Sequence, residues 1–292
     1  MSVDKLRKGL PIDELRLRRF ARLAAPMLRG ASAQGIGPHA SRNRAGAGLE
    51  FLDLRDYTMG EDARHIDWRQ TARRQRLVVR QYRDETASDW LLCVDGSASM
   101  HDDAKWRLVT ELTTALAYLF IYAGHSVALA VFAERVHAHC PAGRGQRQFA
   151  TIVRELSAYQ PPSRGGASLP GLCAPLIGKT CNVVVLSDFL REDAMNDDLH
   201  RLRAQVSTAS AIQVLANDET NVHTSGPAVI YDSELGTEQR LDLGPAATTA
   251  AANTLDTHNR RLRERVTSLG VRLSACKAGD TWERVLLAHL GA

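Results

Sequence analysis

One carboxylate and two hydroxyls follow an apolar run at alternate positions. Asp95, Ser97 and Ser99 come directly after the run that starts at Trp90. Such a run predicts a buried parallel strand, and the loop after it faces the crevice in which open α/β sheets bind ligands. Hydroxyl and carboxylate oxygens suit Mg²⁺, which takes only one or two protein carboxylates. The spacing favours a magnesium site; a plainer alternative is a turn in which Asp95 and Ser97 cap the next helix.

Apolar runs and helical periodicity predict the elements that position these side chains. Apolar residues at a spacing near 3.6 predict a helix over 105–123, and β-compatible runs predict strands at 126–132 and 182–188. Strands alternating with helices imply right-handed crossovers and a doubly wound, mostly parallel α/β sheet of the Rossmann-like kind. The other expected elements are strands near 135–139, 209–215 and 271–274, and helices near 146–156, 193–204, 255–269 and 281–290.

The Asp-x-Ser-x-Ser motif after an apolar strand resembles the opening of the von Willebrand factor type A domain, where it forms a metal-ion-dependent adhesion site. In that family a threonine from a Gly-rich loop and a later aspartate complete the site. Asp188 matches the aspartate, and the loop 165–168 matches the Gly-rich loop. The threonine position falls on Ala167, which has no side-chain oxygen, so we expect the hydroxyl of Ser168 instead. The resemblance implies these metal ligands, direct or through water: Asp95, Ser97, Ser99, Ser168 and Asp188.

The segment before this strand resembles a second family, the domain of unknown function 58 (DUF58). That family joins such a segment to a von Willebrand A-like domain, and its bacterial members resemble partners of MoxR-type AAA+ ATPases, which remodel or mature other proteins. The resemblance implies a fold and a class of partner, and no reaction. The matching motifs lie at 46–51, 54–57, 60–62, 64–68, 72–73 and 77–80.

The chain is expected to divide at residue 88. Residues 1–88 form a small helical and β appendage, and 89–292 form the von Willebrand A-like domain with a hairpin insertion near 228–243. We expect this hairpin and a strand at 77–82 to share one small β unit. Residues 31–48 are rich in Gly, Ala and Ser and predict a connector. An ion-pair network around Trp68 is expected to lock the appendage, through Arg55, Arg64 and Arg73 with Asp53, Asp56, Asp62 and Asp67.

Composition limits the classes of protein. The 292 residues contain no run of 18 apolar residues, so no transmembrane helix is expected. The N-terminus lacks the apolar core of a signal peptide, and the five cysteines have no C-x-x-C spacing, which together favour a cytoplasmic protein with free thiols.

Basic residues concentrate near the N-terminus. The segment 15–23 predicts a basic amphipathic helix that contacts an anionic membrane surface or an acidic partner; a solvated face on a helix docked by its leucines is the commoner explanation. Nucleic acid is not expected, because no aromatic platform accompanies the charge.

The sequence therefore predicts a non-enzymatic interaction protein. We expect Mg²⁺, with Mn²⁺ or Ca²⁺ as alternatives, to capture an Asp or Glu carboxylate of a partner, which is a MoxR-type ATPase or its protein substrate. The main alternative is a metal-dependent hydrolase or phosphatase in which Asp95 is nucleophile or ligand. Asp102 and Asp103 are its candidate acid/base groups, although acids at a helix start also suit the helix dipole. A third reading is a metal-free scaffold, because of Ala167.

Overall fold

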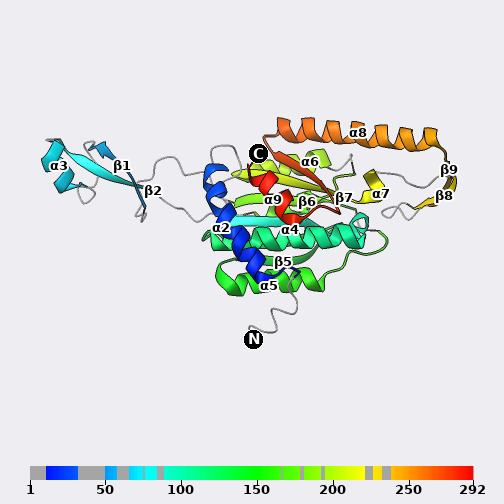
Figure 1. The fold of residues 1–292 in the computed structure, drawn as a ribbon, viewed down its shortest axis with the longest axis horizontal. Helices are drawn as coiled ribbons and strands as arrows, with labels where there is room; N and C mark the ends of the chain where they lie inside the picture. Colours follow the sequence, from blue (N-terminus) through cyan, green and yellow to red (C-terminus); the bar gives the residue numbers. More distant parts are fainter. Residues whose placement is uncertain are drawn as a thin grey trace. The chain divides into compact units, whose positions relative to one another are not determined.

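The structure is a computed structural model (Figure 1). The residues form two compact units: the larger contains Met1–Pro38 and Ser88–Ala292, and the smaller contains His39–Ala87. The structure describes residues 11–31, 50–57, 66–74, 76–83, 89–165, 167–177, 181–191, 195–220, 226–231 and 238–291.

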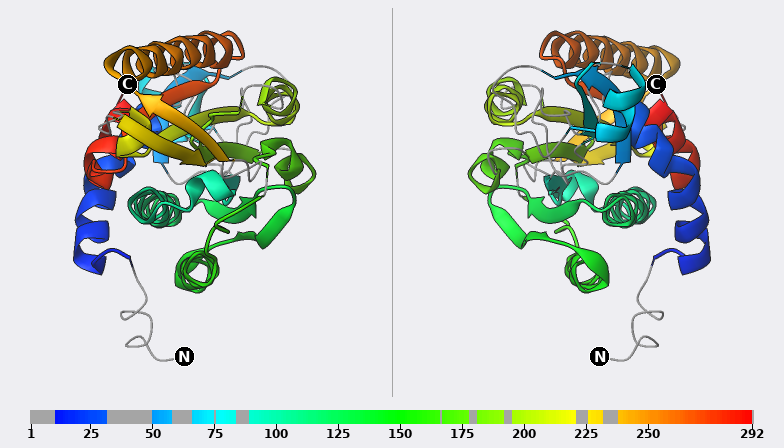
Figure 2. Two further views of the ribbon diagram at one scale, coloured as in Figure 1. Left: turned by 90° about the vertical axis from the view of Figure 1, so that its right-hand side faces the viewer. Right: turned by 90° about the vertical axis from the view of Figure 1, so that its left-hand side faces the viewer.

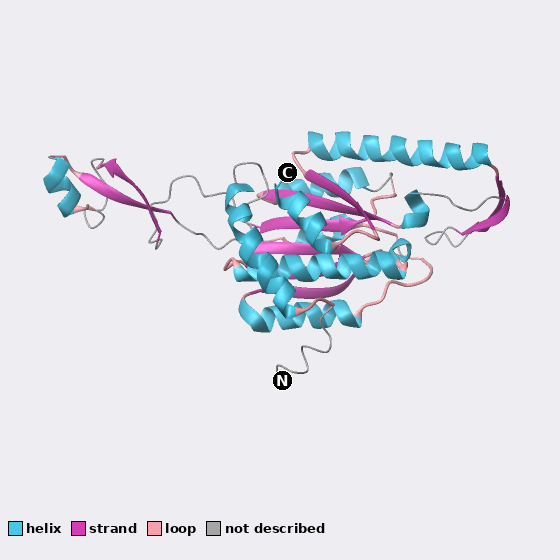
Figure 3. Cartoon of the chain, viewed as in Figure 1, coloured by secondary structure: helices cyan, strands magenta, loops and turns pink. Residues whose placement is uncertain are grey.

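A six-stranded sheet forms the centre of the larger unit (Figure 3). The strand order is β10-β7-β6-β3-β4-β5, and every neighbouring pair is parallel except β4 and β5. The strands β4 and β5 lie on one side of β3, and the later strands β6, β7 and β10 lie on its other side. The direction in which successive strands are added therefore reverses between β3 and β6. The strands are β3 (Asp89–Asp95), β4 (Ser126–Phe132), β5 (Val136–Gly143), β6 (Cys181–Ser187), β7 (Thr208–Leu215) and β10 (Arg272–Lys277).

Helices cover both faces of this sheet (Figure 2). Trp90 and Leu92 point into one apolar core, and Leu91 and Cys93 point into the other, as alternation along a strand requires. The predicted doubly wound, mostly parallel α/β fold is confirmed. The first core is covered by α2 (Glu14–Ala31), α4 (Asp103–Tyr122), α5 (Gly145–Ala158) and α9 (Trp282–Gly291), and the second by η3 (Pro170–Leu176), α6 (Met195–Gln205) and α8 (Pro245–Ser268).

The N-terminal helix α2 packs in the larger unit on α4 and α9. Leu17 and Phe20 lie in the core, whereas Leu15 and Leu23 are 63% and 62% exposed. The helix is therefore docked by apolar side chains, but Leu15 and Leu23 are not among them. Its contact with a membrane surface or acidic partner stays a prediction. In the described part of the chain, no helix has both the length and the apolarity needed to cross a bilayer.

Two hairpins stand outside the main sheet. In the smaller unit β1 (Glu50–Asp56) pairs with β2 (Val78–Arg83), and the Asp67 carboxylate caps α3 (Trp68–Arg74) by accepting from the N–H groups of Arg69 and Gln70.

The predicted hairpin of the larger unit consists of β8 (Gly226–Tyr231) and β9 (Glu238–Leu243). The expectation of one shared β unit is wrong, because β1-β2 and β8-β9 are separate sheets and belong to different units. In each hairpin the two strands pair with each other. The strand β9 is followed directly by α8. Of the connector predicted at 31–48, Ala31 is the last residue of α2 and the remainder lies outside the described residues. Most of the Arg–Asp network around Trp68 also lies outside the described residues and side chains.

Candidate functional site

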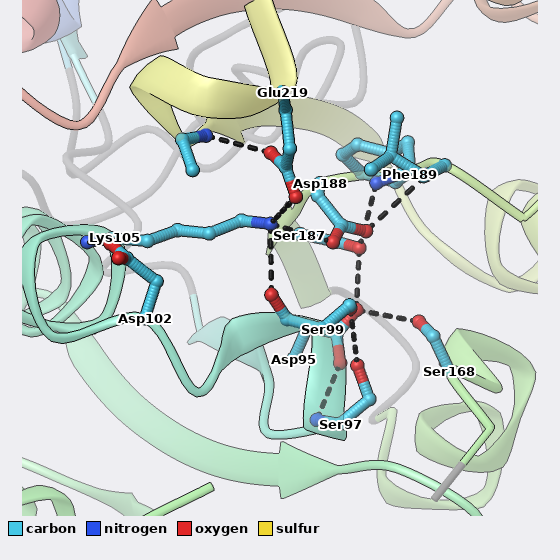
Figure 4. Close-up of polar contacts among 12 residues, drawn as sticks. Asp95, Ser97, Ser99, Asp102, Lys105, Ser168, Ser187, Asp188, Phe189 and Glu219 are labelled. Atoms are coloured by element: carbon cyan, nitrogen blue, oxygen red, sulfur yellow. Dashed lines mark hydrogen bonds and ion pairs between the residues drawn. The ribbon is translucent and has the colours of Figure 1, made fainter. Parts of the chain in front are cut away.

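The predicted site lies where the strand order reverses, at the carboxyl ends of β3 and β6. Asp95 is the last residue of β3, and Asp188 follows the last residue of β6. The two strands pair in parallel with Val94 opposite Leu186, so their ends meet at one edge of the sheet. Open α/β sheets bind ligands at such a switch point. Figure 4 shows the side chains that gather there.

The Asp95 carboxylate is fully buried and accepts three hydrogen bonds. The Ser97 N–H donates to Oδ1 at 2.9 Å, and the hydroxyls of Ser168 and Ser187 donate to Oδ2 at 2.6 and 2.5 Å. Burial, and after it the negative charge of Asp188, raises the pKa of Asp95, while the three hydrogen bonds oppose the rise. Asp95 is therefore an acid for which a nearby cation would compensate the cost of burial.

The turn after β3 places two more hydroxyls beside this carboxylate. The Oγ atoms of Ser97 and Ser99 lie 3.0 Å apart. A Cβ on Gly96, between Asp95 and Ser97, would lie 2.5 Å from the ring of Tyr159, so a larger residue there would displace that ring. The Tyr159 hydroxyl donates to the Gly96 carbonyl at 2.8 Å and holds the turn. The turn thus presents both serine hydroxyls with little freedom.

A fully buried lysine enters the site from the first turn of α4. The Lys105 ammonium donates to the Ser99 carbonyl at 2.9 Å, to Asp188 Oδ2 at 2.9 Å and to Glu219 Oε1 at 2.7 Å. The other Glu219 oxygen accepts from the Ala216 N–H at 2.7 Å. Burial lowers the pKa of Lys105, but the charges of Asp188 and Glu219 outweigh it, so the pKa lies above its ordinary value. Lys105 is therefore an ammonium ion with all three donors used.

The corner after β6 has an unusual backbone conformation. Phe189 has φ of 53°, the only positive φ outside glycine among the described residues. Its N–H donates to Ser187 Oγ at 3.1 Å, and its carbonyl lies 2.7 Å from His258 Nε2 on α8. The Asp188 carbonyl accepts from Gln213 Nε2 at 3.0 Å. Backbone strain of this kind persists only where surrounding contacts fix it, and it is common at functional sites.

A cavity of about 10 Å³ lies beside the cluster, which is close to the volume of one water-sized sphere. No group of three or more His, Cys, Asp and Glu side chains is placed to hold a metal within the described ranges. The predicted ligand set contains only two such side chains, Asp95 and Asp188, and its other members are serine hydroxyls. The cavity is lined by Ser168, Pro170, Asp188, Phe189, Leu190 and Arg191.

All five residues predicted as ligands come together at this edge. Ser168 reaches Asp95 although the threonine position is Ala167. Asp102 caps α4 by accepting from the Lys105 N–H at 2.8 Å, which is the helix-start role that its position also allowed. Sequence reasoning missed Ser187, Lys105 and Glu219. Ser187 had a signal, because it precedes Asp188 at the end of the same strand.

The fold and the cluster together define an α/β protein with an oxygen-rich polar site at the switch point of its sheet. The chain belongs to the DUF58 family, described as proteins of unknown function, whose match spans residues 53–268. Two mycobacterial relatives, Uncharacterized protein Mb1516 of Mycobacterium bovis and Uncharacterized protein Rv1480 of Mycobacterium tuberculosis, are each 26% identical over 247 residues. The match covers 81% of this chain and 77% of each relative.

Two solved structures from Bacteroides species are also similar. The hypothetical protein BatB of Bacteroides thetaiotaomicron is 12% identical with a TM-score of 0.43, over 70% of this chain and 97% of that chain. An aerotolerance-related membrane protein of Bacteroides fragilis has the same identity and TM-score, over 70% and 100%.

Proposed function

We propose that this chain is a divalent-cation-dependent protein-interaction module of the von Willebrand A type. One observation carries the proposal: at the switch point of the sheet, the Asp95 carboxylate accepts from the hydroxyls of Ser168 and Ser187, and the paired hydroxyls of Ser97 and Ser99 and the Asp188 carboxylate lie in the same cluster. Hard oxygen donors with few carboxylates are the set that Mg²⁺ takes from proteins. The residues expected to hold the ion, directly or through water, are Asp95, Ser97, Ser99, Ser168 and Asp188.

The protein supplies a rigid donor set and leaves much of the cation's charge unneutralised. Ser97 and Ser99 contribute neutral hydroxyls on a turn held by Tyr159, and Asp188 is already paired with Lys105. A bound divalent cation supplies residual positive charge at an open coordination position, where a partner's Asp or Glu carboxylate can bind. This arrangement supports binding of a partner and requires no covalent step.

The partner that we propose is a MoxR-type AAA+ ATPase or a protein that such an ATPase remodels. The chain's membership in the DUF58 family supports this choice. The resemblance to that family, noted from the sequence, implies partners of this class.

A pull-down tests the partnership. Tagged protein with Mg²⁺ should retain the ATPase at least tenfold better than Asp95→Ala protein, and EDTA should reduce wild-type retention to the mutant level. Asp103→Asn is the matched control, because this exposed acid lies at the start of α4 and outside the cluster. Equal retention by wild type and Asp95→Ala would contradict the cation-bridged contact.

A further inference from the structure

Lys105 and Glu219 have no part in the proposed set of ligands, yet both are built into the site (Figure 4). The Lys105 side chain is fully buried, and the side chain of Glu219 is 25% exposed. Glu219 belongs to the short helix α7 (Asn217–Thr220) that follows β7, and both of its oxygens accept hydrogen bonds. The pair therefore has a fixed position next to Asp188.

The hydrogen bonds divide the site into two halves. The three Lys105 donors go to Ser99, Asp188 and Glu219, so none remains for Asp95. Asp95 is instead surrounded by a backbone N–H and hydroxyls, which carry no charge. The lysine thus compensates the charge of Asp188 and Glu219, whereas the hydrogen bonds to Asp95 come from uncharged groups.

The formal charges of the cluster bear on the kind of cation that would suit it. The three carboxylates of Asp95, Asp188 and Glu219 and the one ammonium of Lys105 give a formal charge of −2. Buried charge without compensation is costly, so a site of this charge is matched by one divalent ion. Without Lys105 the formal charge would be −3, and without the Glu219 charge it would be −1.

We propose that Lys105 and Glu219 are specificity-determining residues that set the charge of this site to match a divalent cation. Neither side chain belongs to the proposed set of ligands; Lys105 would act through its hydrogen bonds to Asp188 and the Ser99 carbonyl, and Glu219 through Lys105. The inference rests on the proposed cation site. It adds that the formal charge of the cluster determines which cation that site prefers. It predicts that cation affinity follows the formal charge of the cluster.

Four proteins test this rule. They are Glu219→Gln with a charge of −1, wild type with −2, Lys105→Met with −3, and the double variant Lys105→Met/Glu219→Gln, which returns to −2. Mg²⁺ and La³⁺ are titrated into each in a buffer free of phosphate, with affinity measured by calorimetry and by the shift in Tm. Mg²⁺ affinity is expected to rise at least about tenfold per added negative charge, as charges within several ångströms of a divalent ion should produce.

The double variant is the decisive control. It removes the same lysine contacts as Lys105→Met, so a purely structural role predicts that the two behave alike. The charge rule predicts instead that the double variant returns to the wild-type Mg²⁺ affinity, and that preference for La³⁺ over Mg²⁺ increases only in Lys105→Met. Equal affinities across all proteins that respond would overturn the inference. If Lys105→Met does not fold, the comparison of wild type with Glu219→Gln and with the double variant decides the question.

Failure of the underlying site gives a different result. If none of the four proteins responds to Mg²⁺ or La³⁺, there is no cation site, and the proposed function fails together with the inference. If wild type responds and the charge order is absent, only the inference fails.

Discussion

Replacing Lys105 with methionine is expected to lower the free energy of unfolding by about 3–5 kcal/mol in buffer without divalent cations, the cost of breaking a buried ion pair from one side. Methionine fills much of the same space but leaves Asp188 and Glu219 without their counter-ion. The Asp188 side chain is only 3% exposed, so water cannot take the place of the ammonium. Urea unfolding followed by circular dichroism measures the loss.

A surface ion pair provides the control for this change. Arg154 lies 3.0 Å from Glu155, but its side chain is 59% exposed. Exposed pairs contribute about 0–1 kcal/mol, so Arg154→Met should change stability by no more than that. A loss below about 1 kcal/mol for Lys105→Met would contradict the account of Lys105 as a buried counter-ion.

The pH dependence of the Lys105 contribution has a defined sign. Because the pKa of Lys105 is raised in the folded protein, its contribution is fully present below the unfolded value of about 10.4 and is lost as pH rises through the folded pKa. The difference between wild type and Lys105→Met should therefore stay constant between about pH 7 and 9. A difference that disappears within that window would mean that Lys105 is neutral there.

Replacing Trp90 with alanine is expected to cost about 3–5 kcal/mol, because it removes the largest side chain of the central strand. Trp90 is 1% exposed and stacks on Phe120 of α4, with ring centroids 3.9 Å apart. It holds β3 against the helix that carries Lys105, so the cluster should also lose its geometry. Urea unfolding followed by circular dichroism gives the change without relying on tryptophan fluorescence.

Comparing Trp90→Phe with Trp90→Ala separates the contribution of ring packing to stability from that of the indole N–H. Within the described residues, the buried Trp90 N–H has no hydrogen-bond partner, so phenylalanine removes a donor that is not satisfied. It also keeps a ring against Phe120. We expect Trp90→Phe to cost less than about 1.5 kcal/mol, and an equal cost for both variants would contradict this account of the packing.

Periodicity along the sequence predicted the elements that build the site. The strand at 126–132 has the predicted bounds, and the helix at Asp103–Tyr122 differs from 105–123 by two residues or fewer at each end. Asp95 and Asp188 each follow a buried strand, and the carboxyl ends of parallel strands meet at one edge of a sheet. The sequence alone therefore predicted that the two residues lie close together. In contrast, α8 begins at Pro245, ten residues before its predicted start, because its first turns are mostly exposed and rich in Ala and Thr.

The presence of Lys105 and Glu219 in the site could not be predicted in this way. Lys105 is 83 residues from Asp188 and 114 from Glu219 along the chain. Lysine is rarely buried, and only the tertiary structure places Lys105 inside the protein. Ser168 shows the opposite case: this residue, next to the expected threonine position, was named from the sequence, and its hydroxyl donates to Asp95.

Thermal unfolding with and without magnesium tests the central claim most directly. A ligand that binds only the folded protein stabilises it by RT ln(1 + [L]/Kd), about 2.7 kcal/mol at a hundredfold excess over Kd. Wild type should unfold at a higher temperature in millimolar Mg²⁺ than in EDTA, and Asp95→Ala should show no difference. No increase in wild type, or the same increase in both proteins, would contradict a cation site at Asp95.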